Sequence, residues 1–183
     1  MSSHLFVISG PSGAGKGTIV KRVLERLPDL HLSISATTRP PRGDEKDGID
    51  YYFLDDSAFD QKLAEDDFLE WAPVHGKRYG TLRSAVVDDL ASGHDVLLEI
   101  DVQGALKVQE RYPDARLIFI EPPSMAELEK RLRLRGTDSE EQIELRLDNA
   151  VWEMSQRSRY NISIVNDDID TAVDETVAFI EAQ

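Results

Sequence analysis

Short apolar runs rich in β-branched residues alternate along this chain with longer segments in which apolar positions recur every three or four residues. The short runs predict buried strands, and the longer segments predict helices that pack one face against them. Strands are expected at residues 5–9, 96–100, 116–120 and 162–165. Apolar strands separated by helices are typical of a parallel sheet covered on both faces, so the pattern predicts an α/β fold.

Helices are expected at residues 16–27, 102–111, 124–135, 139–159 and 171–181. Two of them start with a capping-box signal, in which Ser124 is followed by Glu127 and Ser139 by Gln142. Residues 33–90 break this rhythm, because they combine a proline-rich loop, aromatic or alternating pieces and one helix near residues 57–64. We expect this stretch to form an α+β insertion in the sheet domain.

Composition narrows the class of protein. The chain has 183 residues and no cysteine, which indicates one domain without disulfides or thiolate metal sites. Its longest apolar runs are far shorter than a membrane span, and its first residues lack a signal-peptide pattern. We therefore expect a soluble, cytoplasmic protein that does not bind membranes. The formal charge of −14 argues against nucleic acid as a partner, although a local cluster of cations still binds a small anion.

A glycine-rich segment lies between the first expected strand and the first expected helix. Glycines let the backbone curl and point its N–H groups inward, and the helix N-terminus adds a favourable partial charge, so the segment predicts a phosphate cradle. Its lysine is expected to reach the β- and γ-phosphates of a nucleotide. The expected ATP-binding loop consists of Gly10, Pro11, Ser12, Gly13, Ala14, Gly15, Lys16, Gly17 and Thr18.

A second candidate anion site contains two arginines in a proline-stiffened loop, Arg39 and Arg42. The planar guanidinium fork matches the geometry of phosphate oxygens, and proline fixes the loop before a ligand arrives. On its own, this pattern fits a basic surface loop equally well.

Nine segments make the chain similar to the guanylate kinase family over nearly its whole length. They are ISGPSGAGKGT (8–18), SATTRPPRG (35–43), DYYF (50–53), FLEWA (68–72), YGT (79–81), LEIDVQGA (98–105), FIEPPS (119–124), RLRLRGTDSEE (131–141) and IVNDD (164–168). The resemblance implies a P-loop nucleoside-monophosphate kinase fold that transfers the γ-phosphate of ATP to GMP with Mg²⁺. It also implies one domain with a parallel-sheet core (1–32, 91–134 and 147–183), a GMP-binding insertion (33–90) and a small lid (135–146).

The same resemblance assigns the GMP side of the site. The residues at the family's GMP-phosphate contacts are Arg39, Arg42, Tyr51 and Tyr79. Those that read the guanine base in the family are Ser35, Glu70 and Thr81, and Asp101 falls near the acceptor. A carboxylate accepts both the N1–H and the N2–H₂ donors of guanine, whereas adenine offers it a single amino donor. A site built on such hydrogen bonds rejects the wrong base by roughly 10⁴-fold or more.

On the ATP side, Arg131, Arg135 and Arg146 match the family's mobile lid, and Asn166 falls near the adenine. Arg131 and Arg135 are four residues apart and so share a helix face, although charge runs of this kind are commonly solvated faces. We expect Lys16, Mg²⁺ and the lid arginines to neutralise the transferring phosphoryl group. The acceptor phosphate is expected to be held by the two loop arginines.

Two positions depart from the usual patterns. Gly17 stands where a phosphate loop usually has Ser or Thr, which puts the hydroxyl ligand to Mg²⁺ in doubt. Glu99 stands where the family usually has Asp, and we expect it to hold a Mg²⁺-bound water. The four histidines, at positions 4, 31, 75 and 94, are scattered, and we interpret them as structural or surface residues.

Two alternative functions remain open from the sequence. One is an enzyme of the same fold that phosphorylates AMP, UMP or a sugar phosphate. The other is a guanylate-kinase-like module that binds protein partners without catalysis, although such modules typically lack an intact phosphate loop. The expected partners are the small molecules ATP and GMP, and the sequence leaves the oligomeric state open.

Overall fold

The computed structural model describes residues 3–74, 76–136 and 138–183. His75, in the expected insertion, and Thr137, in the expected lid, therefore lie outside the described residues. A five-stranded parallel sheet forms the centre of the molecule, with the strand order β2-β7-β1-β8-β9. These strands are β1 (Leu5–Ser9), β2 (Leu30–Leu32), β7 (Asp95–Glu99), β8 (Arg116–Glu121) and β9 (Ile162–Val165). The expected parallel sheet is confirmed.

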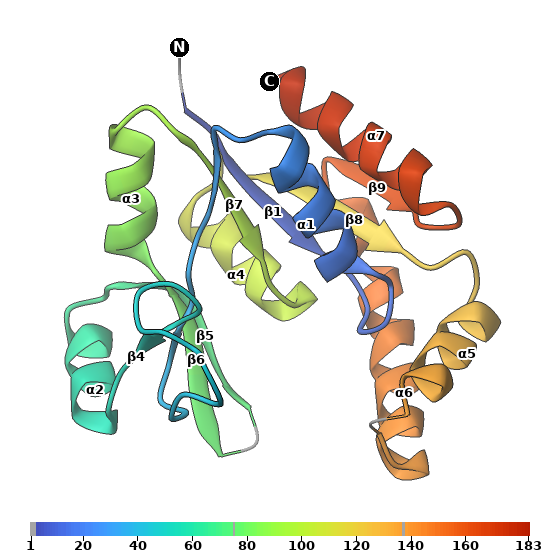
Figure 1. Cartoon of the computed structure of the whole chain (residues 1–183), viewed down its shortest axis with the longest axis horizontal. Coiled ribbons are helices and arrows are strands. Elements are labelled where there is room, and N and C mark those ends of the chain that lie inside the picture. The colour runs from blue at the N-terminus through green and yellow to red at the C-terminus, as the bar shows by residue number, and fades with distance from the viewer. Residues whose placement is uncertain (1–2, 75, 137) are drawn as a thin grey trace.

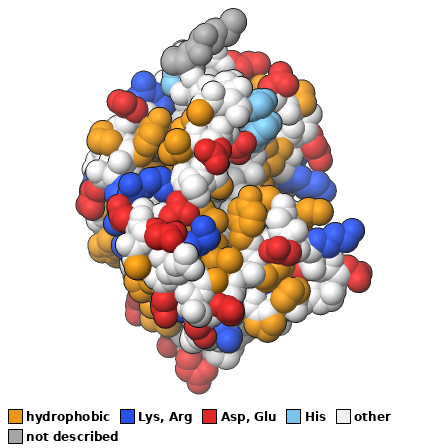
Figure 2. Space-filling model, turned by 90° about the vertical axis from the view of Figure 1, so that its left-hand side faces the viewer, with side chains coloured by type: hydrophobic (Ala, Val, Ile, Leu, Met, Phe, Trp, Pro, Cys, Tyr) orange, Lys and Arg blue, Asp and Glu red, His pale blue; other side chains and the backbone are white. Residues whose placement is uncertain are grey.

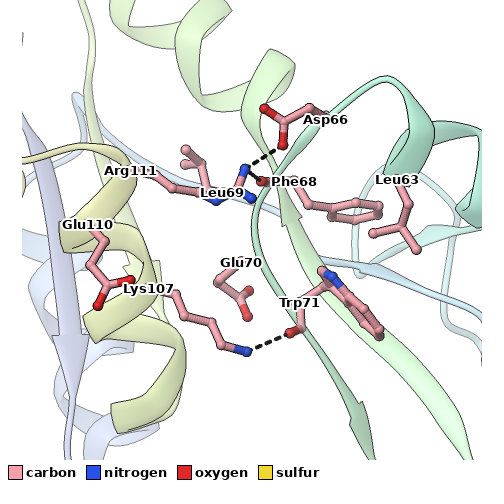
Figure 3. Close-up of a pocket in the computed structure, with 9 residues that line it drawn as sticks. All are labelled: Leu63, Asp66, Phe68, Leu69, Glu70, Trp71, Lys107, Glu110 and Arg111. Atoms are coloured by element: carbon pink, nitrogen blue, oxygen red, sulfur yellow. Dashed lines mark hydrogen bonds and ion pairs between the residues drawn. The ribbon is translucent and has the colours of Figure 1, made fainter.

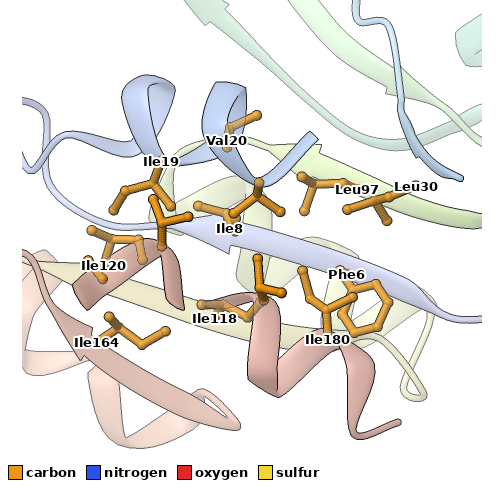
Figure 4. Packing of buried hydrophobic residues seen from close by; sticks show 14 of the residues in the cluster. Phe6, Ile8, Ile19, Val20, Leu30, Leu97, Ile118, Ile120, Ile164 and Ile180 are labelled. Carbon is orange, nitrogen blue, oxygen red and sulfur yellow. The ribbon is translucent and has the colours of Figure 1, made fainter. Parts of the chain in front are cut away.

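Both faces of this sheet are buried, as the unbroken apolar strands predicted. Side chains alternate along β1, so Phe6 and Ile8 belong to one buried cluster while Leu5 and Val7 belong to the other. Figure 4 shows the first cluster, in which residues of the sheet meet α1 (Lys16–Arg26) and α7 (Ile169–Glu181). The second cluster is covered mainly by α3 (Arg83–Ala91) and α4 (Val102–Arg111).

A second, smaller sheet lies beside the core (Figure 1). Its strand order is β4-β3-β6-β5, from the strands β3 (Ala36–Thr37), β4 (Tyr52–Phe53), β5 (Phe68–Val74) and β6 (Lys77–Leu82). Helix α2 (Asp56–Ala64) packs on it through the buried ring of Phe59, which stacks on Phe68. This is the expected α+β insertion, and the carboxyl-terminal part of residues 33–90 forms α3, whose Val86 packs into the core.

The helices α5 (Met125–Arg135) and α6 (Glu140–Ser155) pack on each other on the opposite side of the molecule (Figure 1). They share the buried residues Leu128, Leu132, Ile143 and Ala150. The predicted caps are present, because Ser124 accepts from the N–H of Glu127 and Ser139 forms a reciprocal capping box with Gln142.

Two local features differ from the sequence expectations. Strand β2 was not predicted, because three residues are too few for a hydrophobic period to emerge. The long helix expected to reach residue 159 ends at Ser155, and a 3₁₀ turn, η1 (Arg157–Arg159), follows it. Within the described residues, no helix is long and apolar enough to cross a membrane.

Candidate active site

The glycine-rich loop begins where β1 ends, at the carboxyl edge of the parallel sheet. Strand β1 lies between β7 and β8, so the chain order reverses at this point, and open α/β sheets bind ligands in the crevice that such a reversal creates. Gly10 has a φ of 148°, and a side chain there would overlap the carbonyl oxygen of Ile120 on β8. The loop therefore requires glycine at this position for both conformation and space.

Lys16 opens α1, and its ammonium group folds back over the loop. The Nζ atom donates to the carbonyl oxygens of Gly10 at 2.6 Å and Pro11 at 3.0 Å. Burial lowers the pKa of Lys16, and the negative charges of Glu99, Glu153 and Asp101 oppose that shift. A desolvated cation at a helix N-terminus is suited to a polyphosphate.

Two carboxylates face this lysine from different elements. Partial desolvation raises the pKa of both Glu99, at the exposed end of β7, and Glu153, on α6, while the charge of Lys16 lowers it. Glu153 was not singled out from the sequence, because it reads as one of many charged residues on a long helix. A side chain at Gly17 would lie 3.5 Å from Oε1 of Glu99, so the two departures from the usual patterns are neighbours in space.

Asn166 ties the end of β9 to the phosphate loop. Its side-chain Nδ2 donates to the carbonyl oxygen of Ala14 at 2.7 Å, and both residues are buried. Gly15 has a φ of 96°, and any side chain there would overlap the Asn166 amide. Asn166 is therefore engaged with the loop backbone, a contact that its sequence position did not reveal.

Two of the three arginines expected on the lid are held by hydrogen bonds and ion pairs. Arg146 donates to Ser12 Oγ at 2.6 Å and to Asp138 at 3.2 Å, and so connects α6 to the phosphate loop. Arg131 pairs with Glu127 at 3.3 Å and donates to the backbone oxygen of Asn166 at 3.0 Å. The third lid arginine, Arg135, is exposed and has no ion-pair partner among the described residues.

On the other side of the loop, Arg39 is 7% exposed and forms two hydrogen bonds with the Glu45 carboxylate, at 2.8 and 2.9 Å. Its guanidinium lies 5.2 Å from the ring centre of Tyr51. Glu45 also accepts from the backbone N–H of Arg42, whose own side chain is exposed and whose charge lowers the pKa of Glu45. Glu45 was not identified from the sequence, where it stands among several residues of both charges.

The aromatic candidates gather around this arginine. The ring centres of Tyr51 and Tyr79 lie 6.1 Å apart with an edge-on angle of 71°. Hydrogen bonds that Arg39 donates to Glu45 and Tyr79 raise the pKa of Arg39, so its guanidinium remains charged at every physiological pH. The structure thus brings the expected phosphate contacts Arg39, Tyr51 and Tyr79 together.

The three expected base-reading residues occupy one row across the small sheet. Glu70 on β5 pairs with Thr81 on β6, and Thr81 Oγ1 donates to Glu70 Oε1 at 2.9 Å. Ser35 directly precedes β3, whose antiparallel register with β6 pairs the next residue, Ala36, with Gly80. Cross-strand partners present their side chains on the same face, so Glu70 and Thr81 form one polar pair, and the register continued by one residue puts Ser35 opposite Thr81.

The Glu70 carboxylate is half-buried between β5 and α4. Burial raises its pKa, Thr81 donates a hydrogen bond that lowers it, and Asp101 raises it further. Asp101 caps α4 by accepting from the N–H of Gly104 at 2.7 Å. A side chain at Gly104 would lie 3.2 Å from Glu70 Oε2, so this glycine makes room for the carboxylate. In the sequence, a glycine inside a predicted helix was the one sign that another group approaches the helix closely at this position.

Figure 3 shows the adjoining space, a hollow of about 420 Å³ between β5 and α4. Lys107 extends from α4 and donates to the backbone oxygen of Trp71 at 3.1 Å. Its charge lowers the pKa of Glu70, against the effect of burial. The insertion and the lid lie on opposite sides of the phosphate loop (Figure 1).

Comparison with known proteins identifies the family of the chain. Residues 2–183 match the model of the family described as guanylate kinase. The chain is 52% identical over 179 residues to a guanylate kinase from Caldanaerobacter subterraneus, which covers 98% of this chain and 87% of that protein. It is 45% identical over 183 residues to one from Thermotoga maritima, covering 100% and 88%. The crystal structure of guanylate kinase from Anaplasma phagocytophilum is similar with a TM-score of 0.76 at 34% identity, covering 99% of this chain and 86% of that one.

Proposed function

The chain belongs to the guanylate kinase family and is a nucleoside-monophosphate kinase that phosphorylates GMP with ATP, and from this premise we propose which of its residues perform the transfer. Members of the family typically use Mg²⁺ with ATP. The observation that supports the assignment best is the half-buried Glu70 carboxylate. It shares one face of the small sheet with Thr81, next to the arginine and tyrosine cluster.

In this proposal the small sheet binds GMP. Glu70 accepts hydrogen bonds from guanine N1–H and N2–H₂, with Thr81 and Ser35 beside it, and Asp101 lies close to the acceptor. Arg39, Arg42, Tyr51 and Tyr79 hold the phosphate. Glu45 already orients the Arg39 guanidinium through two hydrogen bonds, so little side-chain entropy is lost when the phosphate binds.

The phosphate loop binds ATP in this proposal, with its backbone N–H groups around the phosphates and Lys16 at the β- and γ-phosphates. Arg131, Arg135 and Arg146 neutralise the transferring group from the lid. Phosphoryl transfer depends on positioning and charge stabilisation, and no side-chain nucleophile is needed because the acceptor phosphate is already anionic. Asn166 acts on the loop through Ala14 rather than through the nucleotide base.

The residues around Lys16 fit a Mg²⁺ ion that accompanies ATP. Glu99, Asp101 and Glu153 are hard oxygen donors, and Mg²⁺ prefers oxygen ligands while keeping several of its waters. With Gly17 in place of a hydroxyl residue, we propose that Glu99 holds the ion through such a water. When bound, the ion neutralises charge on the phosphates.

The test uses purified protein with ATP, Mg²⁺ and each of GMP, AMP, UMP and CMP, followed by ADP release in a coupled assay. We expect fast turnover with GMP and little with the others. Replacing Glu70→Gln puts an amide donor opposite guanine donors, and we expect kcat/KM for GMP to fall by about 10²–10⁴-fold. Glu110→Gln is the matched control, because Glu110 lines the same hollow but is exposed.

Two results would overturn parts of this assignment. If Glu70→Gln retains GMP turnover and selectivity, the base is read elsewhere, although the phosphate-loop assignment stands. If GMP binds to the wild-type protein without any ADP release, the chain has lost transfer.

A further inference from the structure

Three side chains with metal-binding atoms meet at the edge of the core sheet opposite the phosphate loop. His31 lies on β2, Asp89 near the end of α3, and His94 in the turn that leads into β7. One ligand atom from each lies within 4.8 Å of the other two. None of these residues belongs to the nucleotide site described above.

The contacts between the three are already close. Nδ1 of His31 lies 3.4 Å from Oδ1 of Asp89, and the imidazole rings of His31 and His94 are stacked with their centres 3.9 Å apart. Nδ1 of His94 is buried and has no hydrogen-bond partner in the part of the chain that the structure describes. A buried polar atom without a partner requires an explanation, and an ion that binds there is one.

The backbone holds the three residues in a fixed frame. The N–H of His94 donates to the carbonyl oxygen of Asp89 at 3.2 Å, which closes the turn after α3. His31 is paired with Val96 in the parallel register of β2 and β7, two residues beyond His94. The distances among these residues are therefore determined by the fold and not by a flexible loop.

We propose that His31, Asp89 and His94 form a binding site for a divalent transition-metal ion such as Zn²⁺. Two imidazole nitrogens and one carboxylate oxygen are ligands that Zn²⁺ and its neighbours prefer, with solvent at the open positions. Bonds of about 2.0–2.1 Å require the ligand atoms to draw together to about 3.3 Å in a tetrahedral arrangement. The two rings reach that arrangement by turning out of their stack.

The surroundings allow a cation to arrive. All three residues are half-buried, and His94 also lines a surface hollow of about 820 Å³. Figure 2 shows the side of the molecule that carries α2 and α3, where histidine side chains reach the surface with acidic side chains nearby. The chain's charge of −14 adds a general attraction for cations.

The bound ion would connect the two ends of the insertion. Strand β2 leads into the small sheet and α3 follows it, so a metal that bridges His31 and Asp89 cross-links the segments at which the insertion leaves and rejoins the core. We therefore expect the ion to stabilise the folded chain in the absence of nucleotide. At free zinc of about 100 times Kd, the melting temperature is expected to rise by about 5–10 °C.

The experiment uses the full-length protein without a histidine tag, treated with chelator and titrated with ZnCl₂ in a calorimeter, with Co²⁺ absorption as a spectroscopic check. We expect one equivalent to bind, and Co²⁺ to show the absorption bands of a low-symmetry site with nitrogen ligands. His31→Gln and His94→Gln should each weaken binding by more than the roughly 10–100-fold that losing an outer partner of a metal ligand costs. His4→Gln is the matched control, because His4 lies beside Asp95 in a separate pair.

Melting each variant without metal checks that it folds, and the two histidine variants test the site independently. Absence of zinc binding, or binding that both histidine variants retain, would overturn the proposal. Zinc held by the carboxylates around Lys16 would persist in both histidine variants, so it would be recognised as a different site. Loss of binding in His4→Gln equal to that in His94→Gln would also refute the assignment.

Discussion

Replacing Asn166→Ala removes a single buried hydrogen bond beneath the phosphate loop. The Asn166 amide donates to the Ala14 carbonyl at 2.7 Å, and both groups are shielded from water. An acceptor left buried without a partner costs about 1–3 kcal/mol. For a chain of this size, a loss of about 2 kcal/mol lowers the melting temperature by about 4–8 °C. The contact of Arg131 survives, because that arginine donates to the backbone oxygen of Asn166.

The kinetic consequence separates two roles for this residue. If Asn166 positions the loop, its loss displaces the phosphate cradle, and a misplacement of about 1 Å costs about 10²-fold in rate. We then expect kcat/KM to fall by the same factor with ATP and with GTP as phosphate donors, since both place the same phosphates in the loop. If Asn166 instead contacts adenine, the loss will be confined to ATP.

Asn161→Ala is the matched control. Its side-chain oxygen accepts from the N–H of Leu117 at 2.7 Å, another amide-to-backbone bond, which joins the residue before β9 to β8 and is remote from the loop. We expect it to cost about 1 kcal/mol of stability and to leave donor kinetics unchanged. Unchanged donor kinetics in a folded Asn166→Ala protein would refute the positioning role.

Further predictions concern the loop, the lid and the base reader. Gly10→Ala forces a strained φ and overlaps a carbonyl oxygen of β8, so we expect it to destabilise the fold by about 2–5 kcal/mol in denaturant titrations. Gly136→Ala, also at positive φ but with open space around it, should cost about 1 kcal/mol, and an equal loss in both would contradict the steric argument. Arg146→Ala should lower kcat by about 10³-fold or more, whereas Arg133→Ala, on an exposed salt bridge, should leave it nearly unchanged. Equal effects in these two variants would refute a specific role for Arg146. Because burial raises the pKa of Glu70, this carboxyl becomes protonated on acidification before an ordinary glutamate does, and it then no longer accepts both guanine donors. The KM for GMP should therefore rise as pH falls, starting above the usual glutamate range near pH 4.3, and this pH dependence should disappear in Glu70→Gln.

Local patterns predicted most of the core. Apolar strands, helical periods and capping boxes depend on residues that are near one another in the chain, and the strands β1, β8 and β9 and the helix α4 lie where those patterns place them. The phosphate loop was also recognisable, because its glycines are required by its own backbone conformation. Strand β2 was not predicted, because three residues are too few to show a hydrophobic period.

The residues that contact the site residues could not be predicted from the sequence. The resemblance indicated Arg39, Glu70 and Asn166, but no local pattern indicates that Glu45 orients the first or that the third holds the Ala14 carbonyl. Some of those contacts join segments that are distant in the chain, and others involve a residue that stands among many charged residues. Burial in the folded chain decides which of many similar carboxylates has a raised pKa. The sequence shows Gly104 as a glycine within a predicted helix. The reason for a glycine there is the close approach of the Glu70 carboxylate, which only the structure shows.

The sequence by itself determined the alternation of strands and helices, the conformation of the glycine-rich loop, and the family. Only the tertiary structure decided which side chains face one another. In the folded chain Glu99 lies beside Gly17, and the charge of Lys16 acts on Glu153. The rings of His31 and His94 stack beside Asp89. The physical reason is that periodicity and backbone conformation are local properties, whereas burial and pairing arise only when the parallel sheet brings distant residues to a common edge.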